Sequence, residues 1–383
     1  MIKQYLFIII LLCALHVKAH AQNTPKLMGI VKLPSGSLNS KYKFHVKNNT
    51  LLFILNTQLY YYKLSNEDSV ITYVDFGRIP INSNEIIFDV SLINDSSFYL
   101  LTNKYLYSFN IDFTTKSVSN SPNILHKQEN QLYIDIYQLK NKEDVLLGVN
   151  FTGFPEKDPK INIKSLEGSK SYHHFVPCDP YNVYLRNKLV ASNGIGTFIV
   201  QSDNLKNDFH VLDSTLKVIH TFNYFDSSVF DSKLGNEVCA QAQKYRALGT
   251  EEEYDNLITK IDQFPHIDKM VFLDDTTLLI MGYFTKNGQS KLLFSKLYFN
   301  ASFTQLLKTE PIRHTFNYKT LDHRYQKENT PINPFGKLTR CDGGKIYYID
   351  WIVDTTKVVS NDDYQKAILL PSNQTKIGIY IFK

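Results

Sequence analysis

Side chains able to do chemistry are gathered most densely in residues 311–336, a stretch without strand or helix pattern. It contains His314, His323, Arg324 and Tyr325. Histidines can donate hydrogen bonds, an arginine can hold a carboxylate or sulfate through two parallel N–H groups, and a tyrosine ring can stack on a ligand. Loops of this length in compact domains are usually either functional or unstructured. The stretch therefore predicts a site for a polar ligand, either anionic or carbohydrate, with a merely structural loop as the alternative.

Two further candidate ligand residues, Tyr172 and His173, come earlier in the chain. We expect them in a long loop that shares one mouth of the fold with residues 311–336. His173 and His174 would both bind a metal only if the backbone bends there, because neighbours on a strand point to opposite faces. Surface histidines are the better interpretation of this pair.

Metal and catalytic motifs are weak. Carboxylates at Asp274-Asp275, Asp342 and Asp362-Asp363 are ligands that Ca²⁺ uses, but hydrogen bonding within their own turns explains them better. We therefore expect no cofactor. The chain has no G-x-S-x-G elbow, H-E-x-x-H pair or P-loop. Catalytic residues stay unknown, and the sequence favours a binding protein over an enzyme.

The N-terminus has the order of a secretory signal peptide. Lys3 supplies a positive charge, residues 6–15 are apolar, and Ala19-His20-Ala21 resembles a cleavage site. We expect residues 1–21 to be removed and residues 22–383 to be secreted or periplasmic. No membrane span should remain, because the apolar run is shorter than the roughly 20 residues that a span needs.

A retained anchor and a lipoprotein are the alternatives to simple cleavage. Lipidation would use Cys13, but Leu12 before it is larger than the small residue that this modification requires. The remaining cysteines, Cys178, Cys239 and Cys341, allow one disulfide with one free thiol, or no disulfide. Their pairing is left open.

The mature chain is only mildly basic. Loss of the two lysines in the signal peptide lowers the formal charge from +5 to +3. Its Lys and Arg residues are scattered among acids, whereas a nucleic-acid surface needs them gathered on one face. The expected partner is therefore a polar small molecule, a glycan or a protein, and not a nucleic acid.

A repeat supplies the elements that must position these residues. Its clearest copy is residues 92–110, where a polar turn, an apolar run, a second turn and an aromatic run follow one another. The polar turn with an apolar strand after it occurs six times in all, at Asn48-Asn49, Asn94-Asp95, Asn141-Lys142, Asn193-Gly194, Asp274-Asp275 and Asp342-Gly343. Apolar residues on both faces of these strands indicate sheets covered on both sides. The first steps of about 46 to 53 residues match four-stranded blades.

These patterns predict an all-β, six-bladed β-propeller in one domain. Its units are expected at residues 38–78, 79–123, 124–168, 169–224, 265–310 and 311–383. Residues 27–33 should add a strand to the last unit and hide its open edge. Residues 231–264 change to a helical period, with Thr250 and Glu253 as a capping box, and predict an inserted helical hairpin.

The strand Ile346-Tyr347-Tyr348-Ile349-Asp350 resembles those of YWTD- and NHL-type six-bladed propellers. With its export signal and its Asn-, Tyr- and Lys-rich composition, the chain resembles secreted TolB-like propeller proteins of Bacteroidota. This resemblance implies a binding or scaffold protein, since most members of such families are binding or scaffold proteins. Some members are enzymes. We therefore expect an exported propeller that binds a carbohydrate or peptide. A hydrolase or lyase with its site at the channel mouth is the alternative, and an assembly partner of an envelope complex is a third class.

Overall fold

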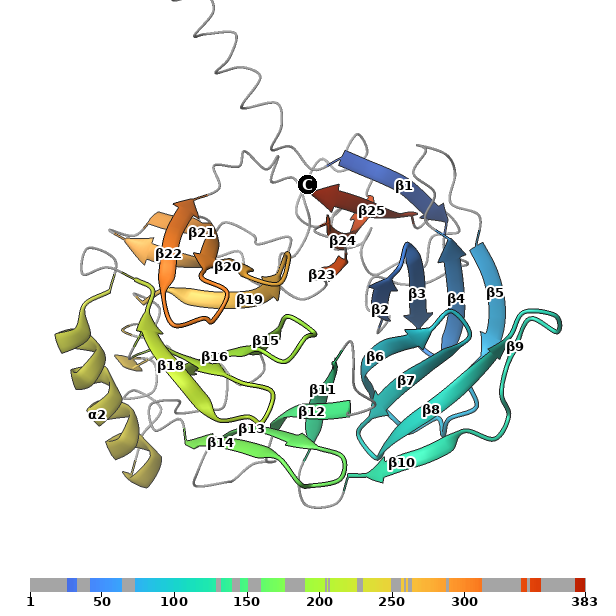
Figure 1. Cartoon of the computed structure of the whole chain (residues 1–383), viewed down its shortest axis with the longest axis horizontal. Helices are drawn as coiled ribbons and strands as arrows, with labels where there is room; N and C mark the ends of the chain where they lie inside the picture. Colours follow the sequence, from blue (N-terminus) through green and yellow to red (C-terminus); the bar gives the residue numbers. More distant parts are fainter. Residues whose placement is uncertain are drawn as a thin grey trace, which may run out of the picture.

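The computed structural model is built almost entirely of antiparallel strands (Figure 1). It describes residues 26–32, 42–63, 73–128, 132–139, 145–150, 160–175, 190–203, 207–225, 230–248, 264–286, 289–311, 339–342, 345–352 and 376–382, together with 205, 256, 257 and 260.

Six antiparallel sheets are present in this part of the chain. The first contains β2 (Tyr42–Lys47), β3 (Thr50–Leu55), β4 (Gln58–Lys63) and β5 (Tyr73–Arg78). The second contains β6 (Ile87–Asn94), β7 (Ser97–Thr102), β8 (Tyr105–Asp112) and β10 (Asn123–Lys127), with β9 (Ser117–Val118) beside β8. The third contains β11 (Tyr133–Gln138), β12 (Val145–Asn150), β13 (Lys160–Ser165) and β14 (Ser171–Phe175).

The other three sheets follow the same order. The fourth contains β15 (Val190–Ser192), β16 (Phe198–Asp203), β17 (Asp208–Leu212) and β18 (Val218–Asn223). The fifth contains β19 (His266–Phe272), β20 (Thr277–Lys286), β21 (Gln289–Phe299) and β22 (Leu306–Pro311). The last contains β23 (Thr339–Asp342), β24 (Lys345–Ile352), β25 (Lys376–Phe382) and the N-terminal β1 (Lys26–Lys32).

The sheets follow one another in chain order around a common centre, with their first strands innermost (Figure 1). Inner strands of neighbouring sheets lie against each other, as β2 does with β6 and β23, and as β19 does with β15 and β23. Adjacent sheets pack against each other through their apolar faces. Leu52 and Ile54 of β3, for example, share a buried cluster with Val90 and Leu92 of β6. This is the arrangement of a β-propeller, so the prediction of an all-β propeller fold is confirmed.

Local sequence signals placed the second strand of every sheet correctly. The six apolar runs predicted as strands are β3, β7, β12, β16, β20 and β24. Before β3, Asn48 and Asn49 have φ values of 51° and 58°, which is the primed hairpin turn that asparagine tolerates. The pair at Asn141-Lys142 and the residue Gly343 lie outside the described residues.

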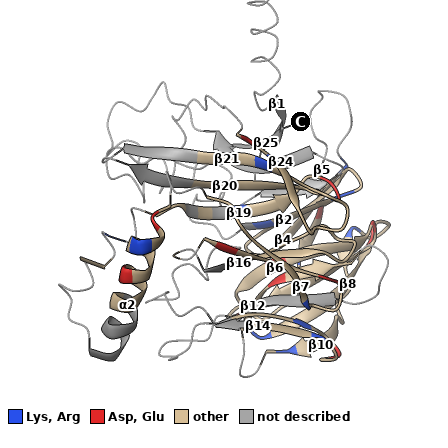
Figure 2. Cartoon of the chain, turned by 60° about the vertical axis from the view of Figure 1, so that its left-hand side comes forward, with Lys and Arg blue, Asp and Glu red and all other residues tan. Residues whose placement is uncertain are grey.

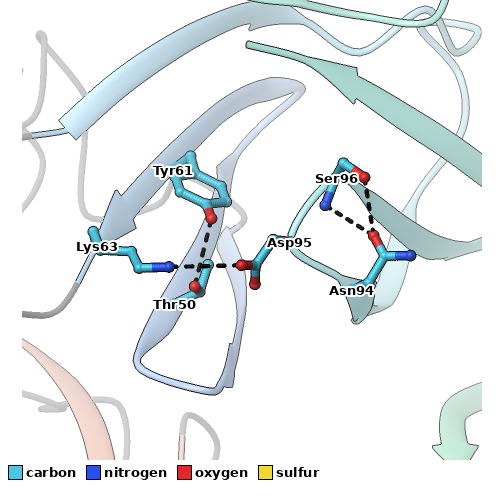
Figure 3. Close-up of polar contacts among 6 residues, drawn as sticks. All are labelled: Thr50, Tyr61, Lys63, Asn94, Asp95 and Ser96. Atoms are coloured by element: carbon cyan, nitrogen blue, oxygen red, sulfur yellow. Dashed lines mark hydrogen bonds and ion pairs between the residues drawn. The ribbon is translucent and has the colours of Figure 1, made fainter.

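The turn at Asn94-Asp95 shows how a polar side chain stabilises such a hairpin (Figure 3). The main-chain N–H of Ser96 donates to Oδ1 of Asn94 at 2.8 Å, and the Ser96 hydroxyl lies 3.1 Å from the same oxygen. Asp95 forms an ion pair of 3.6 Å with Lys63 of the first sheet. Because both of these side chains are well exposed, that ion pair contributes little to stability.

Two predicted unit boundaries are wrong. β10 continues the second sheet past residue 123, and β14 closes the third sheet instead of opening the fourth. β14 folds back on β13 through a tight turn in which Gly168 has a φ of 73°, a conformation that glycine adopts without strain. The turn fixes β14 beside β13, so the third unit ends later than the repeat length suggested.

The last sheet joins the two ends of the described chain. β1 pairs antiparallel with β25, with Lys26 opposite Ile381 and Lys32 opposite Lys376. The expectation that an N-terminal strand completes the C-terminal sheet is confirmed.

Helix α2 (Ser232–Leu248) lies on the outside of the sheets (Figures 1 and 2). The side chain of Asp231 caps it, because Oδ1 accepts the N–H groups of Lys233 at 3.0 Å and Leu234 at 3.1 Å. A Cβ added to Gly235 would lie 2.5 Å from the carbonyl oxygen of Leu205. Glycine is therefore required for the helix to approach the fourth sheet this closely.

The helical hairpin predicted at residues 231–264 is described only in part. α2 occupies its first half, and residues 256, 257 and 260 are helical in its second half. Val238 of α2 and Leu257 are buried in the same apolar cluster. The connection at residues 249–255 lies outside the described residues, so the hairpin stays a prediction.

Gln201 of β16 is a polar residue buried in an apolar position. Its side chain is 0% exposed, and neither Nε2 nor Oε1 has a hydrogen-bond partner in the described structure. The residues at the same place in the second strands of three other sheets are Ile54, Leu101 and Met281. Burying an amide without hydrogen bonds opposes folding.

We therefore expect Gln201→Met to raise the free energy of unfolding by about 1 to 2 kcal/mol, because the methionine fills a similar volume without polar atoms. Urea unfolding followed by circular dichroism measures the change. Gln58→Met is the matched control, because the Gln58 side chain donates a hydrogen bond to Oδ1 of Asp75. We expect this variant to be less stable than the wild type, since it loses that hydrogen bond. A destabilised Gln201→Met variant would contradict the view that the buried amide opposes folding.

Candidate functional site

Charged side chains recur at one position of the inner strands. Lys43, Asp89, Asp135 and Lys269 lie opposite Ile54, Leu101, Gly148 and Met281 of their second strands. Asp89, Asp135 and Lys269 are 3%, 1% and 3% exposed. An innermost strand has one edge without a partner in its own sheet, so its main-chain groups need other hydrogen-bond partners.

Polar side chains of the inner strands connect neighbouring sheets through these main-chain groups. Oδ2 of Asp89 accepts from the N–H of Ile136 at 3.0 Å, and Nδ1 of His45 accepts from the N–H of Leu92 at 3.2 Å. Nζ of Lys47 donates to the carbonyl oxygen of Ile93 at 2.7 Å. These contacts stabilise the packing of the inner strands, and they explain the buried Asp89 without a ligand.

Nζ of Lys47 also donates to Oε1 of Gln138 at 3.2 Å. Lys47 therefore spans the first three sheets at one end of their inner strands.

A second group of polar side chains lies near the surface between the second and third sheets. We call it the Tyr133 cluster, and it consists of His126, Tyr133, Asn162, Lys164 and His173. The rings of His126 and Tyr133 have their centroids 6.0 Å apart, and Nζ of Lys164 lies 5.1 Å from the centroid of Tyr133. Nδ2 of Asn162 donates to the Tyr133 hydroxyl at 3.3 Å. His173 pairs with Asn162 across β13 and β14, so both side chains lie on one face of the sheet.

The two ends of the Tyr133 cluster differ in exposure. The Tyr133 ring is 0% exposed, and its burial raises the pKa of its hydroxyl to about 12 against the opposing effect of the Asn162 hydrogen bond. Tyr133 therefore stays neutral. His173 is exposed. The cluster thus offers a lysine held on an aromatic ring and a histidine on the same face of the sheet, which is suited to binding an anionic group.

The expectation that Tyr172 lies in a loop and offers its ring to a ligand is wrong. Tyr172 belongs to β14, is 6% exposed and packs among core residues of the third and fourth sheets. Its hydroxyl lies 2.8 Å from Nδ1 of His210. Burial raises the pKa of Tyr172 and lowers the pKa of His210, although the charge of Asp208 opposes the second shift. Tyr172 therefore joins two sheets instead of contacting a ligand.

Of the two predicted site residues that the structure describes, His173 is the exposed one. It follows Tyr172 on β14, so it too lies in a strand and not in the expected loop, and its side chain lies on the opposite, exposed side. The other predicted residues, His314, His323, Arg324 and Tyr325, lie outside the described residues. Their meeting with His173 stays a prediction.

Sequence reasoning missed Lys164 and Tyr133 as neighbours of His173. Two signals were available. Asn162 and Lys164 alternate with the apolar Ile161 and Ile163, which puts the two polar residues on one face of the strand, and Glu167-Gly168 is a turn that folds this strand against β14.

The acidic turn at Asp274 behaves as the sequence suggested. Burial acts to raise its pKa, but hydrogen bonds from Thr276 and Thr277 outweigh that effect and hold the pKa below its usual value. The N–H of Thr276 donates to Oδ1 at 2.9 Å, and that of Thr277 at 2.7 Å. Within the described residues, no group of three or more His, Cys, Asp or Glu side chains could hold a metal ion. None of the described helices is long and apolar enough to cross a membrane.

No protein-family model matches this sequence, and no curated protein is significantly similar to it. Several solved structures are similar in shape. The calcium-binding protein regucalcin from Agrobacterium tumefaciens is 11% identical, with 94% of this chain and 95% of that chain covered and a TM-score of 0.43. The WD40 domain of Toxoplasma gondii coronin is 8% identical, with 94% and 88% covered and a TM-score of 0.42.

A carbohydrate-active enzyme of family AA12 from Trichoderma reesei is 10% identical, with 94% of this chain and 97% of that chain covered and a TM-score of 0.42. Structural similarity at such low sequence identity does not assign a function to this chain. The class of protein is defined by the sheets themselves, and it is the β-propeller.

Proposed function

We propose that this protein is an exported binding or scaffold protein built as a closed, six-bladed propeller. Each of the six sheets is one blade in this proposal, and residues 231–264 form a helical hairpin outside the ring. Residues 1–21 are a signal peptide that is removed on export. Cys239 of α2 is disulfide-bonded, which supports export because disulfides persist mainly in oxidising compartments.

The observation that carries the binding role is the position of the exposed apolar side chains. Among the described residues, four of the eight large hydrophobic side chains that are exposed occupy adjacent positions on the outermost strands of two sheets. They are Ile124 and Leu125 of β10, and Val218 and Ile219 of β18. Apolar surface that the fold itself does not cover favours contact with another molecule.

The proposed ligand is polar and anionic, a carboxylate- or sulfate-bearing peptide or glycan. His173 contacts it beside Lys164, whose ammonium group is held over the Tyr133 ring. Arg324 holds the anionic group bidentately, Tyr325 stacks on the ligand, and His314 and His323 donate hydrogen bonds. Tyr172 is left out of this set because its ring is buried.

A thermal-shift screen of residues 22–383 tests the proposed function. Acidic and basic peptides, neutral and sulfated glycans, and divalent cations are each added to the purified protein. We expect an anionic peptide or glycan to raise the melting temperature, because a ligand that binds only the folded state stabilises it. Arg324→Ala, Tyr325→Ala and His173→Ala should each weaken this shift, whereas His220→Ala on the outer strand β18 should not. A screen without any stabilising ligand contradicts the binding role, and a shift unaffected by all three variants contradicts the site.

A further inference from the structure

We infer that the outer edge of β10, together with the Tyr133 cluster, binds an extended acidic segment of a partner protein. The segment adds to β10 as a further strand. This inference rests on the proposed binding role and names the class of its partner.

β10 is the outermost strand of the second sheet and is hydrogen-bonded to β8, with Asn123 opposite Ser108 and Ile124 opposite Tyr107. In the part of the chain that the structure describes, no other strand pairs with it at Ile124 or Leu125. These two side chains are 58% and 42% exposed. An edge strand with exposed apolar side chains is a template for the addition of a strand from another chain.

Three strands near this edge carry side chains of one sign of charge. Lys127 of β10 and Lys164 of β13 are basic, and β10, β13 and β14 contain no Asp or Glu. The neighbouring β8 ends in Asp112, which lies beyond the residues of β8 that pair with β10. His126 and His173 add imidazole N–H donors on the same strands. The chain as a whole has nearly balanced charge, with 42 Lys and Arg against 37 Asp and Glu. A strand whose side chains alternate between acidic and apolar complements this surface, because it can meet Ile124 with one face and the basic groups with the other.

Ring contacts connect the edge strand to the basic strands. His126 of β10 lies against the ring of Tyr133, and Nζ of Lys164 from β13 lies over that ring. The exposed His173 is opposite Asn162, which donates to the Tyr133 hydroxyl. The buried Tyr133 ring thus brings His126 of β10 and Lys164 of β13 close together, and the exposed His173 of β14 lies on the same face of the third sheet as Lys164.

The outer strand β22 provides a matched comparison. Leu307 is 58% exposed, as Ile124 is. Lys308 and Glu310 of β22, however, form an ion pair with each other at 2.8 Å. β22 therefore presents the same apolar exposure on an outermost strand without an excess of positive charge.

Fluorescence anisotropy with a labelled peptide of alternating Glu and Val tests this inference on residues 22–383. We expect the peptide to bind and a Lys-Val peptide not to bind. Ile124→Asp and Lys164→Glu should each raise the Kd at least about tenfold, and Leu307→Asp should leave it unchanged. Added salt should weaken binding, since screening reduces the attraction between exposed charges.

Several outcomes would overturn the inference. If Ile124→Asp and Leu307→Asp raise the Kd equally, the peptide does not bind specifically at the β10 edge. If the Lys-Val peptide binds as well as the Glu-Val peptide, charge complementarity does not explain binding. If the wild type forms a dimer and Ile124→Asp abolishes it, the β10 edge binds a second copy of this chain and not a partner protein. If Ile124→Asp fails to fold, the Lys164→Glu variant still decides, since its side chain lies outside the core. A protein that ignores the acidic peptide but gains stability from another ligand in the thermal-shift screen loses only this inference and keeps the proposed function.

Discussion

Leu257→Asp should lower the free energy of unfolding by about 2 to 4 kcal/mol. Leu257 is 3% exposed, and it packs in the same buried cluster as Val238 of α2, Phe230 and Phe264. The substitution removes apolar contacts and places a carboxylate where it is neither hydrated nor paired. Urea unfolding followed by circular dichroism at neutral pH gives the difference.

Asn256→Asp is the control for this prediction. Its position precedes Leu257 in the same helical segment and is exposed, so it introduces the same charge without burying it. We expect it to change stability by less than about 0.5 kcal/mol. Equal effects of the two variants would contradict the packing of Leu257 in this buried cluster.

The parts of the fold that the sequence predicted depend on neighbouring residues. The turn at Asn48-Asn49 needs only two residues that tolerate positive φ, and the apolar run after it needs only burial on both faces. Their signals therefore survive in a single sequence. The boundary at residue 168 is wrong because it follows from the repeat length, whereas the positive φ of Gly168 makes this residue part of a turn within the third unit.

The parts that could not be predicted depend on residues far apart in the chain. Asp89 and Ile136 are 47 positions apart, and Tyr172 and His210 are 38 apart. The pattern of a strand shows which residues share a face, but not which face meets the next sheet. The Tyr133 cluster also depends on residues far apart in the chain. His126 and Lys164 come close to each other only because both contact the Tyr133 ring, which lies between two sheets. The contact of Tyr172 with His210 belongs to this class too, because neither residue gives a local signal of the other.

Glu85→Ala should lower the free energy of unfolding by about 3 kcal/mol, because it leaves buried donors without an acceptor. Glu85 is 8% exposed. Its carboxylate accepts hydrogen bonds from the Thr102 hydroxyl at 2.6 Å, the Tyr107 hydroxyl at 3.0 Å and Nδ2 of Asn82 at 3.0 Å. Glu85→Gln keeps an acceptor oxygen and should lose less. Equal losses for the two variants would show that the charge, and not the set of accepted hydrogen bonds, matters most.

The same site makes stability depend on alkaline pH. Burial raises the pKa of Tyr107 above its usual value, and the hydrogen bond and charge of Glu85 raise it further. A tyrosine whose pKa is higher in the folded than in the unfolded state stabilises the fold fully below the unfolded pKa of about 10, and this contribution is lost as pH rises through the folded pKa. In Glu85→Gln the pKa of Tyr107 should fall toward its usual value, because the neighbouring negative charge is gone. Unfolding free energies measured at intervals above the unfolded pKa should therefore stop falling at a lower pH in Glu85→Gln than in the wild type. If the loss ends at the same pH in both proteins, burial of the Tyr107 ring alone accounts for the alkaline sensitivity.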